Sequence, residues 1–235
     1  IRNVNLTINT GEFVLLMGES GCGKTTITRL VNGLVPHYYE GKLEGDVLLD
    51  GKSVSDTPLY DLAAMVGSVF QNPKSQFFNV DTDSELAFAC ENLGYPQEDI
   101  LKRIDRTVSD YHIEDLMGRS VFALSGGEKQ KIACASSSVL LPGIMVLDEP
   151  SSNLDMAAID DLRQVLSLWK KQGKTILIAE HRLYYLHDLA DRMLYVKDGE
   201  IEREYTPAEF DSLSDGTRKE MGLRPFSLSK LKPAN

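Results

Sequence analysis

The sequence predicts an α/β fold whose core is a mainly parallel β-sheet. In the second half, apolar segments of strand length at residues 144–147, 175–179 and 193–196 alternate with segments of helical periodicity. Such alternation implies parallel pairing, because each helix returns the chain to the same end of the sheet before the next strand begins. In the first half, a glycine-rich stretch at residues 18–23 joins an apolar strand to a helix, which is a second sign of this architecture.

The first half is predicted to contain four strands and one helix. Alternating apolar residues at 4–8 and the apolar run at 13–17 predict two strands that enter the fold as a hairpin. The second of these is apolar on both faces, so we expect it near the centre of the sheet. Helical spacing of apolar residues at 27–34 predicts the helix, and short apolar runs at 46–49 and 65–70 predict two further strands.

A helical subdomain is predicted in the middle of the chain. Apolar residues recur at helical spacing across residues 83–118, with an interruption at residues 94–96, which read Gly-Tyr-Pro. Because predicted strands precede and follow this region, we interpret it as a subdomain, at about residues 72–135, that is inserted into the core.

Two further helices and a tail complete the prediction. Helical patterns at residues 156–171 and 183–189 separate the strands of the second half. Regular periodicity is lost from residue 207 onward. We therefore expect one domain at residues 1–213, followed by a C-terminal tail or linker at residues 214–235.

Composition and charge restrict the class of protein. The hydrophobic fraction of 42% and the charged fraction of 26% are ordinary for a globular protein. No apolar run approaches the roughly 18 residues that a membrane span needs, so any contact with a membrane is expected through a partner. The formal net charge of -10 opposes nucleic-acid binding. Three cysteines without CxxC spacing favour a reducing, cytoplasmic compartment, and a chain that opens on Ile1 is expected to be a piece of a longer one.

The strongest motif is a phosphate-binding loop that matches G-x-x-x-x-G-K-[ST] between a predicted strand and a predicted helix. Its glycines allow backbone N–H groups to surround the β- and γ-phosphates, and the helix N-terminus adds partial positive charge. Lys24 supplies a full charge, and Thr25 supplies a hydroxyl for Mg²⁺. We therefore predict that ATP is bound by Gly18, Glu19, Ser20, Gly21, Cys22, Gly23, Lys24, Thr25 and Thr26.

Two adjacent carboxylates end a predicted buried strand downstream of this loop. Asp148 at the strand end is suited to hold Mg²⁺ through water, because this ion keeps several waters and takes few carboxylates. Glu149 beside it is suited to polarise an attacking water. Alone, the pair is also typical of a solvated turn, and the upstream phosphate-binding loop favours the chemical role.

A third motif, Leu124-Ser125-Gly126-Gly127-Glu128-Lys129-Gln130, resembles the signature sequence of the ABC ATPases. The same residues are typical of a helix start, with Ser125 as N-cap and Glu128 completing a capping box, and the two interpretations are compatible. Gln71 resembles the family's Q-loop, Asp155 in Ser152-Asn153-Leu154-Asp155 its D-loop, and His181 its switch histidine, in the family's order along the chain. At residues 179–182 the sequence reads Ala-Glu-His-Arg where the family more often has Thr-His-Asp.

The resemblance implies a P-loop NTPase fold with a mainly parallel core sheet, an antiparallel β-subdomain and an inserted α-helical subdomain. It also implies that ATP is hydrolysed at an interface between two ABC ATPase domains. The adenine-stacking aromatic residue of the family is expected upstream of residue 1. The implied catalytic residues are Glu149, His181 and Gln71, the implied Mg²⁺ ligands are Thr25, Gln71 and Asp148, and the residues that act in trans are Ser125, Gly126, Gly127 and Glu128.

Residues 71–78 and 91–94 further resemble the energy-coupling-factor ATPases, which power import of vitamins, their precursors, or cobalt and nickel ions. This implies integral membrane subunits, a second ATPase domain in a homodimer, a heterodimer or the same chain, and a place at the cytoplasmic face of the membrane. The alternative is a soluble ABC ATPase acting in translation or DNA repair. Repair and chromosome members carry long coiled coils that do not fit between Lys24 and Ser125. A kinase or GTPase would lack the signature, and the substrate is not encoded in this chain.

Overall fold

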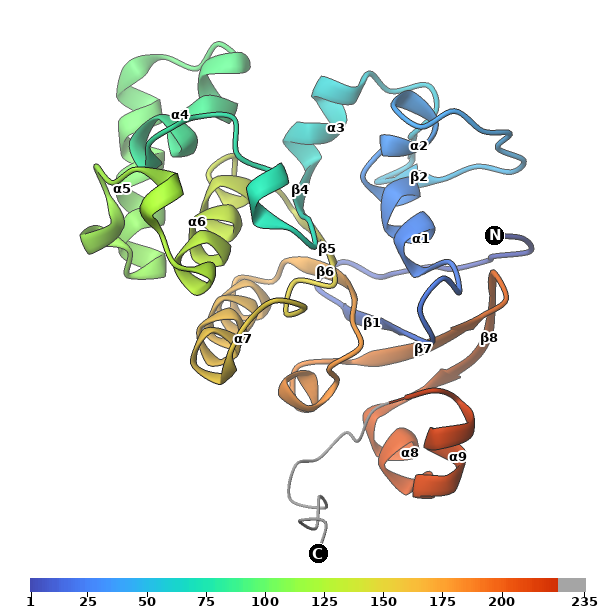
Figure 1. The fold of residues 1–235 in the computed structure, drawn as a ribbon. Helices are drawn as coiled ribbons and strands as arrows, with labels where there is room; N and C mark the ends of the chain where they lie inside the picture. The colour runs from blue at the N-terminus through green and yellow to red at the C-terminus, as the bar shows by residue number, and fades with distance from the viewer. Residues whose placement is uncertain (224–235) are drawn as a thin grey trace, which may run out of the picture.

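A computed structural model describes residues 1–223 of the chain. Its centre is a six-stranded sheet with the order β4-β5-β6-β1-β7-β8 (Figure 1). The first five strands of this order pair in parallel, and only the β7–β8 pair is antiparallel. The mainly parallel sheet predicted from the sequence is therefore confirmed. The strands are β1 Phe13–Met17, β4 Val66–Val69, β5 Ile144–Asp148, β6 Thr175–Ala179, β7 Arg192–Lys197 and β8 Glu200–Tyr205.

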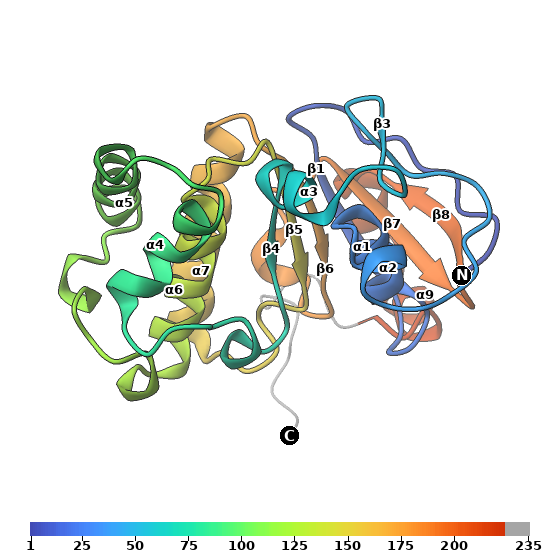
Figure 2. The same ribbon diagram turned by 90° about the horizontal axis from the view of Figure 1, so that it is seen from above.

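Helices cover both faces of this sheet, so β1 is apolar on both sides. Phe13, Leu15 and Met17 pack in the larger core cluster, beneath α6 (Gly126–Ser138) and α7 (Met156–Lys171). Val14 and Leu16 face the opposite cluster, beneath α1 (Lys24–Val31) and α3 (Leu59–Met65). All five side chains are fully buried, as the period of two in a central strand requires. Figure 2 shows the two helix layers on either side of the strands.

The middle of the chain forms a helical region that lies to one side of the sheet (Figure 1). It contains α4 (Thr82–Asn92) and α5 (Gln97–Tyr111), separated at residues 93–96. Tyr111 fixes this region to the core, because its hydroxyl donates to Ser138 on α6 and accepts from the indole N–H of Trp169 on α7. Two 3-10 turns, η2 (Glu114–Leu116) and η3 (Val121–Ala123), lead from α5 back to α6.

The structure differs from the sequence-based expectations in several connecting segments. Residues 4–8 do not form a strand, and β1 pairs with β6 and β7 instead of a hairpin partner. Leu6 and Ile8 still pack against the core, which explains their alternation. The helix expected at residues 183–189 is a single 3-10 turn, η4 (Tyr184–Leu186). The strand expected at 46–49 is shortened to β2 (Leu48–Leu49), which forms a small antiparallel sheet with β3 (Lys52–Ser53). Two further short elements are a helix after α1, α2 (Leu34–His37), and a 3-10 turn after β4, η1 (Pro73–Ser75).

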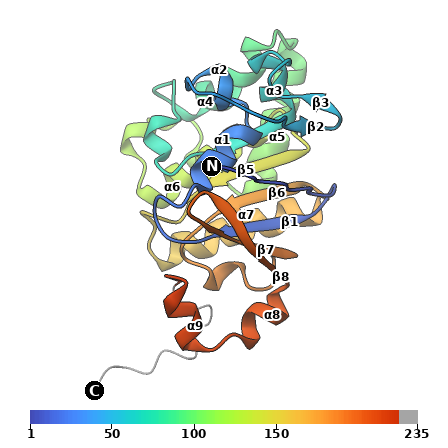
Figure 3. The same ribbon diagram turned by 90° about the vertical axis from the view of Figure 1, so that its right-hand side faces the viewer.

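Past β8 the chain forms two short helices that lack an extended periodic pattern, α8 (Pro207–Ser212) and α9 (Asp215–Glu220). Thr206 and Glu209 form a capping box at the start of α8. The buried Arg218 guanidinium donates to the carbonyls of Phe210 and Asp211 and so ties the two helices together. Figure 3 shows the pair at the end of the molecule beyond β8. The domain limit at residue 213 stays a prediction, and residues 224–235 of the expected linker lie outside the described residues.

Candidate functional site

The predicted site residues of four motifs gather at one edge of the sheet. Parallel strands end at the same edge, so the segments after β1, β4, β5 and β6 meet there. The phosphate-binding loop follows β1, Gln71 follows β4 by two residues, and Glu149 and His181 follow β5 and β6. Four motifs that are far apart in sequence are therefore placed together by topology.

The loop between β1 and α1 has a shape that requires glycine. Gly18 has φ 151°, and a Cβ there would lie 2.2 Å from the carbonyl oxygen of Val196. Gly23, with φ 113°, is the N-cap of α1 and offers no side-chain cap. Because the first N–H groups of a helix have no intrahelical acceptor, the start of α1 presents open donors to an anion. A cleft of about 190 Å³ beside the loop is lined by residues 19–22, the end of β7 and Glu220.

Lys24 places its charge inside this loop. The side chain is only 3% exposed. Its Nζ donates to the carbonyls of Gly18 at 3.0 Å and Glu19 at 2.8 Å, and it lies 3.7 Å from the Cys22 sulfur. The loop thus folds around one ammonium group, and the following residues, Thr25 and Thr26, lie in the first turn of α1.

Thr25 and Asp148 bring two oxygen donors together beside the loop. The Thr25 hydroxyl donates to Asp148 Oδ1 at 2.9 Å. Burial raises the pKa of the Asp148 carboxyl; the hydrogen bond from Thr25 opposes this, and the neighbouring Glu149 charge adds to it. A cation beside Asp148 would relieve this cost, and hydroxyl and carboxylate oxygens are ligands that Mg²⁺ accepts. Within residues 1–223 no cluster of three His, Cys, Asp or Glu side chains could hold a metal, so phosphate and water oxygens would have to complete such a site.

Glu149 is held between two motif residues from different strands. Gln71 Nε2 donates to Glu149 Oε2 at 2.8 Å, and His181 Nε2 lies 2.9 Å from Glu149 Oε1. The Glu149 backbone has φ 45°, in the left-handed region, and its N–H donates to the carbonyl of Ala179 at 2.8 Å. The carboxylate is therefore aimed by its own backbone and by both neighbours, immediately beside Asp148.

The signature segment starts α6 on the other side of the sheet. The Ser125 hydroxyl accepts from the Glu128 N–H at 3.3 Å, and the Glu128 carboxylate accepts from the Ser125 N–H at 2.6 Å, so the capping box is present. The Ser125 N–H, the Ser125 hydroxyl and Arg119, at 2.8 Å, all stabilise the Glu128 carboxylate and lower its pKa to about 2. Ser125 and Gly126 are exposed. The start of α6 is separated from the start of α1 by the central strands in Figures 1 and 2.

The sequence reasoning missed the role of Glu180, which organises the loop around His181. Glu180 is 1% exposed, and its carboxylate accepts from the hydroxyl of Tyr185 at 2.8 Å. Burial, with the Glu180 charge, raises the pKa of the Tyr185 hydroxyl well above its usual range, so this hydroxyl stays a donor. The departure from the Thr-His-Asp pattern at residues 179–182 was the signal that could have pointed to it. Asp155, assigned to the D-loop, caps α7 by accepting from the Ala158 N–H at 2.9 Å.

Comparison with known protein families decides which family these motifs represent. The family described as "ABC transporter" matches residues 1–152. The chain belongs to the ABC transporter family. Its motifs and fold are those of the family's ATPase domain, and within residues 1–223 no helix is long and apolar enough to cross a membrane.

Relatives of this ABC domain are found among curated proteins. A protein of Treponema denticola is 47% identical over 98% of this chain, and one of Pyrococcus abyssi is 40% identical over 89%. Both carry the name "Putative ABC transporter ATP-binding protein". The chain covers 47% of the Treponema protein and 75% of the Pyrococcus protein. It thus spans about half the length of the first of these relatives.

Solved structures share the fold of this ABC domain. CbiO1 from Clostridium perfringens, described as part of the ABC transporter complex CbiONQ, matches with a TM-score of 0.79 and 28% identity over 92% of this chain and 85% of its own. The ATP-binding cassette MJ0796, described as a dimer in a post-hydrolysis state bound to ADP and Pi, matches with a TM-score of 0.74 and 27% identity over 87% of this chain and 89% of its own. The P-loop fold class predicted from the sequence is confirmed.

Proposed function

We propose that this ABC domain binds Mg-ATP, closes against a second ABC domain and hydrolyses ATP to power an importer of the energy-coupling-factor type. The observation that carries the proposal is the Glu149 carboxylate, held at 2.8 Å by Gln71 and at 2.9 Å by His181 beside the phosphate-binding loop. A carboxylate, an amide and an imidazole at the end of a loop built for phosphate are the groups that orient a water toward a γ-phosphate.

ATP binding rests on the loop at residues 18–26. The uncapped start of α1 supplies N–H donors, and Lys24 supplies the full positive charge that partly neutralises the phosphates. The Lys24 ammonium exchanges its contacts with loop carbonyls for contacts with phosphate oxygens. Thr25, Asp148 and the amide oxygen of Gln71 would hold Mg²⁺. The ion, when bound, offsets negative charge on the phosphates.

Hydrolysis follows from the placement of Glu149. Its carboxylate orients the attacking water and accepts hydrogen bonding from it, while His181 donates to the γ-phosphate and Gln71 keeps the carboxylate aimed. None of these residues forms a covalent bond to phosphate, because positioning and charge stabilisation are what phosphoryl transfer needs. The left-handed backbone at Glu149 fixes this aim before ATP arrives.

The signature residues act on ATP bound by a second ABC domain. Ser125 and Gly126 are exposed at the start of α6, and the central strands separate them from the phosphate-binding loop of the same chain. Two chains or two halves of one chain that pair face to face bring each signature, with Glu128 behind it, to the other's loop. The dimer of the similar cassette MJ0796 supports this arrangement.

The segment after Gln71 carries the contact to integral membrane subunits. Gln76 fixes this segment to α6 by donating to the carbonyl of Ala133 at 3.0 Å, and Glu85 accepts from the Phe78 N–H at 3.0 Å. Phe78 itself is 74% exposed and stacks on Phe88 with ring centroids 4.9 Å apart. Because this exposed ring lies on a loop that is fixed to α6 and follows Gln71, it is suited to contact a helix of a membrane subunit and to move that helix when the two ABC domains close.

The membrane partners place the domain at the cytoplasmic face of the membrane and would determine the substrate. The similarity to CbiO1, described as part of CbiONQ, favours a vitamin, a vitamin precursor or a transition-metal ion as the substrate class. The test is purification of the full-length protein from its native membranes in mild detergent, with partners identified by mass spectrometry. Integral membrane partners with a small substrate-binding subunit support the importer. Ribosomal or DNA-associated partners would reject it and leave the ATPase chemistry standing.

A further inference from the structure

The Glu180 carboxylate is a buried junction between two loops of the site. Its Oε1 accepts from the backbone N–H groups of His181 at 2.7 Å and Arg182 at 3.1 Å. Its Oε2 accepts from the N–H of Ser151 at 3.3 Å and from the hydroxyl of Tyr185 at 2.8 Å. A carboxylate that is 1% exposed is stable only when its oxygens are satisfied, and these four donors do so. One side chain therefore joins the loop after β6 to the loop after β5.

Arg182 makes a second connection between the same two loops. Its Nη1 donates to the carbonyl oxygen of Leu154 at 2.9 Å. Leu154 immediately precedes Asp155, the N-cap of α7. Segment 151–155 is thus attached near its start through Glu180 and near its end through Arg182. The residue between these two attachments on the other loop is His181, whose imidazole contacts Glu149.

We propose that Glu180 and Arg182 are positioning residues that clamp segment 151–155, which contains the D-loop residues 152–155, to the loop of His181. The inference rests on the proposed function, in which His181 donates to the γ-phosphate and two ABC domains close face to face. Because the clamp lies on both sides of His181, movement of the D-loop on closure is transmitted to the imidazole. Hydrolysis then depends on whether the partner domain has docked.

The clamp also explains why this chain departs from the commoner Thr-His-Asp pattern. A threonine at position 180 has a single hydroxyl oxygen. It could not accept the four hydrogen bonds that the two carboxylate oxygens of Glu180 accept. An aspartate at position 182 has no donor for the Leu154 carbonyl at neutral pH. The attachment to Ser151 needs the carboxylate of Glu180, and the attachment to Leu154 needs the guanidinium of Arg182.

The test uses the full-length protein and variants that separate a positioning role from a folding role. Arg182→Met keeps an unbranched apolar stem and removes the donor, and Arg182→Lys restores a donor. We expect Arg182→Met to lower kcat for ATP hydrolysis about tenfold, the size of one lost charge-assisted hydrogen bond, with KM for ATP unchanged. Arg182→Lys should recover most of kcat. Backbone amides at 151–155 should exchange hydrogen faster in Arg182→Met than in the other two proteins.

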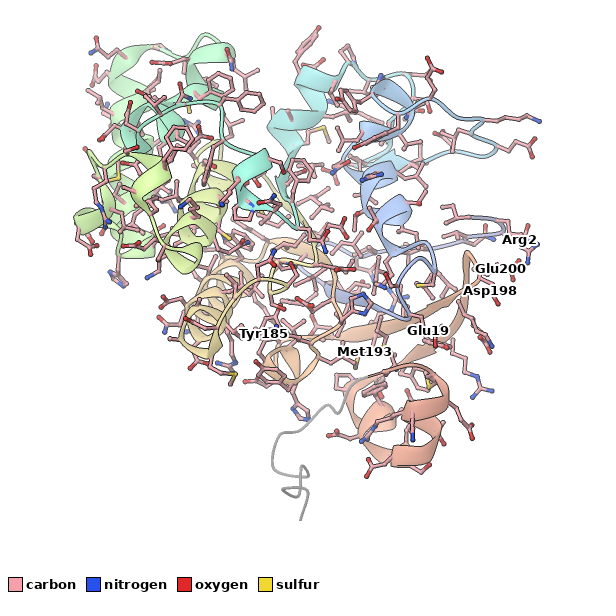
Figure 4. The ribbon with its side chains drawn as sticks, viewed as in Figure 1. Arg2, Glu19, Tyr185, Met193, Asp198 and Glu200 are labelled. Carbon is pink, nitrogen blue, oxygen red and sulfur yellow. The ribbon has the colours of Figure 1, made fainter. Side chains whose placement is uncertain are left out.

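Two neighbouring tyrosines give a matched pair for the Glu180 attachment. Tyr185, which lies next to α7 in Figure 4, donates to Glu180, whereas the Tyr184 hydroxyl contacts the sulfur of Met156 at 3.2 Å. Tyr185→Phe should lower kcat severalfold at unchanged KM, and Tyr184→Phe should leave both unchanged. Both substitutions keep the ring, so neither empties the core.

The outcomes separate the clamp from the proposed function. If the wild-type protein hydrolyses ATP and Arg182→Met keeps both its kcat and its exchange rates at 151–155, the clamp is overturned and the proposed function stands. A fall of kcat without rescue by Arg182→Lys also overturns it. If the wild-type protein does not hydrolyse ATP, the proposed function fails. The exchange measurement then still decides whether the clamp exists.

Discussion

Replacing Glu149 by glutamine removes one negative charge from the proposed hydrolytic site and almost nothing else. The side chains have the same size and shape. The side-chain carbonyl of the new glutamine can still accept from Gln71 Nε2, which lies 2.8 Å from the carboxylate in the wild-type protein. The NH2 group of the new glutamine can donate to His181 Nε2, because this nitrogen can accept in a neutral imidazole. The backbone contact to Ala179 at 2.8 Å is untouched. The variant should therefore fold and bind ATP as the wild-type protein does.

The size of the expected effect follows from what the amide cannot do. It retains the hydrogen bonds of the resting site but cannot accept a proton from the water. Loss of a positioned general base lowers turnover by about 10² to 10⁴. This equals about 2.7 to 5.4 kcal/mol of transition-state stabilisation, at 1.36 kcal/mol for each factor of ten. KM for ATP should change little, because Lys24 and the start of α1 carry the binding.

The assay is phosphate release by the full-length protein under saturating Mg-ATP, with ATP affinity measured by titration. Glu200→Gln is a suitable control for charge, because Glu200 pairs with Arg2 at 2.8 Å in an exposed ion pair at another edge of the molecule (Figure 4). It should keep wild-type turnover. If Glu149→Gln retains turnover within tenfold of wild type, Glu149 does not activate the water and the reasoning from its geometry is refuted.

Three further predictions test other parts of the site. Lys24→Ala should weaken ATP binding about tenfold to a hundredfold in an equilibrium titration, because the only cation inside the loop is lost; wild-type affinity would contradict this role. Glu128→Gln should reduce the free energy of unfolding by about 1 to 2 kcal/mol at pH 7, a value reduced for partial exposure of the side chain. The pKa of Glu128 is about 2 in the folded protein, below its ordinary value of 4.5. The difference in unfolding free energy between wild type and variant should therefore be full above pH 4.5 and shrink as the pH falls toward 2, as measured by urea unfolding. A difference at pH 3 as large as that at pH 7 would argue against this role of Glu128. Phe78→Asp should release the integral membrane partners during purification and leave the ATP affinity unchanged. The control Leu101→Asp, at a position on α5 that is 53% exposed, should not release them.

Central elements could be predicted from the sequence because their patterns are set by burial. β6 and α7 have the predicted bounds, since a strand buried on both faces and an amphipathic helix of several turns leave unmistakable periodicities. The strand predicted at residues 4–8 and the helix predicted at residues 183–189 were wrong, because burial alone does not produce regular secondary structure. Their apolar residues pack against the core without regular backbone pairing, and a pattern of apolar residues does not reveal hydrogen bonds. β8, which is largely exposed, was not predicted at all.

The site shows a similar division. Motif spacing could predict that Lys24, Asp148 and His181 lie at the same edge of the sheet, because the carboxyl ends of parallel strands meet there. It could not predict that Gln71 and His181 hold the two oxygens of Glu149, since such contacts depend on side-chain rotamers. Nor could it predict the four donors on Glu180, three of which are backbone groups that carry no sequence signal.

The two helix starts that serve the proposed ATP site are built differently, and their chemistry remains compatible. The start of α1 has no side-chain cap, so its N–H groups are open to the phosphates of the same chain's ATP. The start of α6 is already capped by Ser125 and Glu128, which would be a poor anion site if the hydroxyl were used up. A serine hydroxyl, however, accepts and donates at once. Ser125 accepts from the Glu128 N–H, and its own O–H, which interacts with the Glu128 carboxylate in the resting site, would turn to donate to a γ-phosphate from the second domain. The capping box therefore fixes the position of the Ser125 oxygen before the partner docks, which is what a site completed only on closure requires.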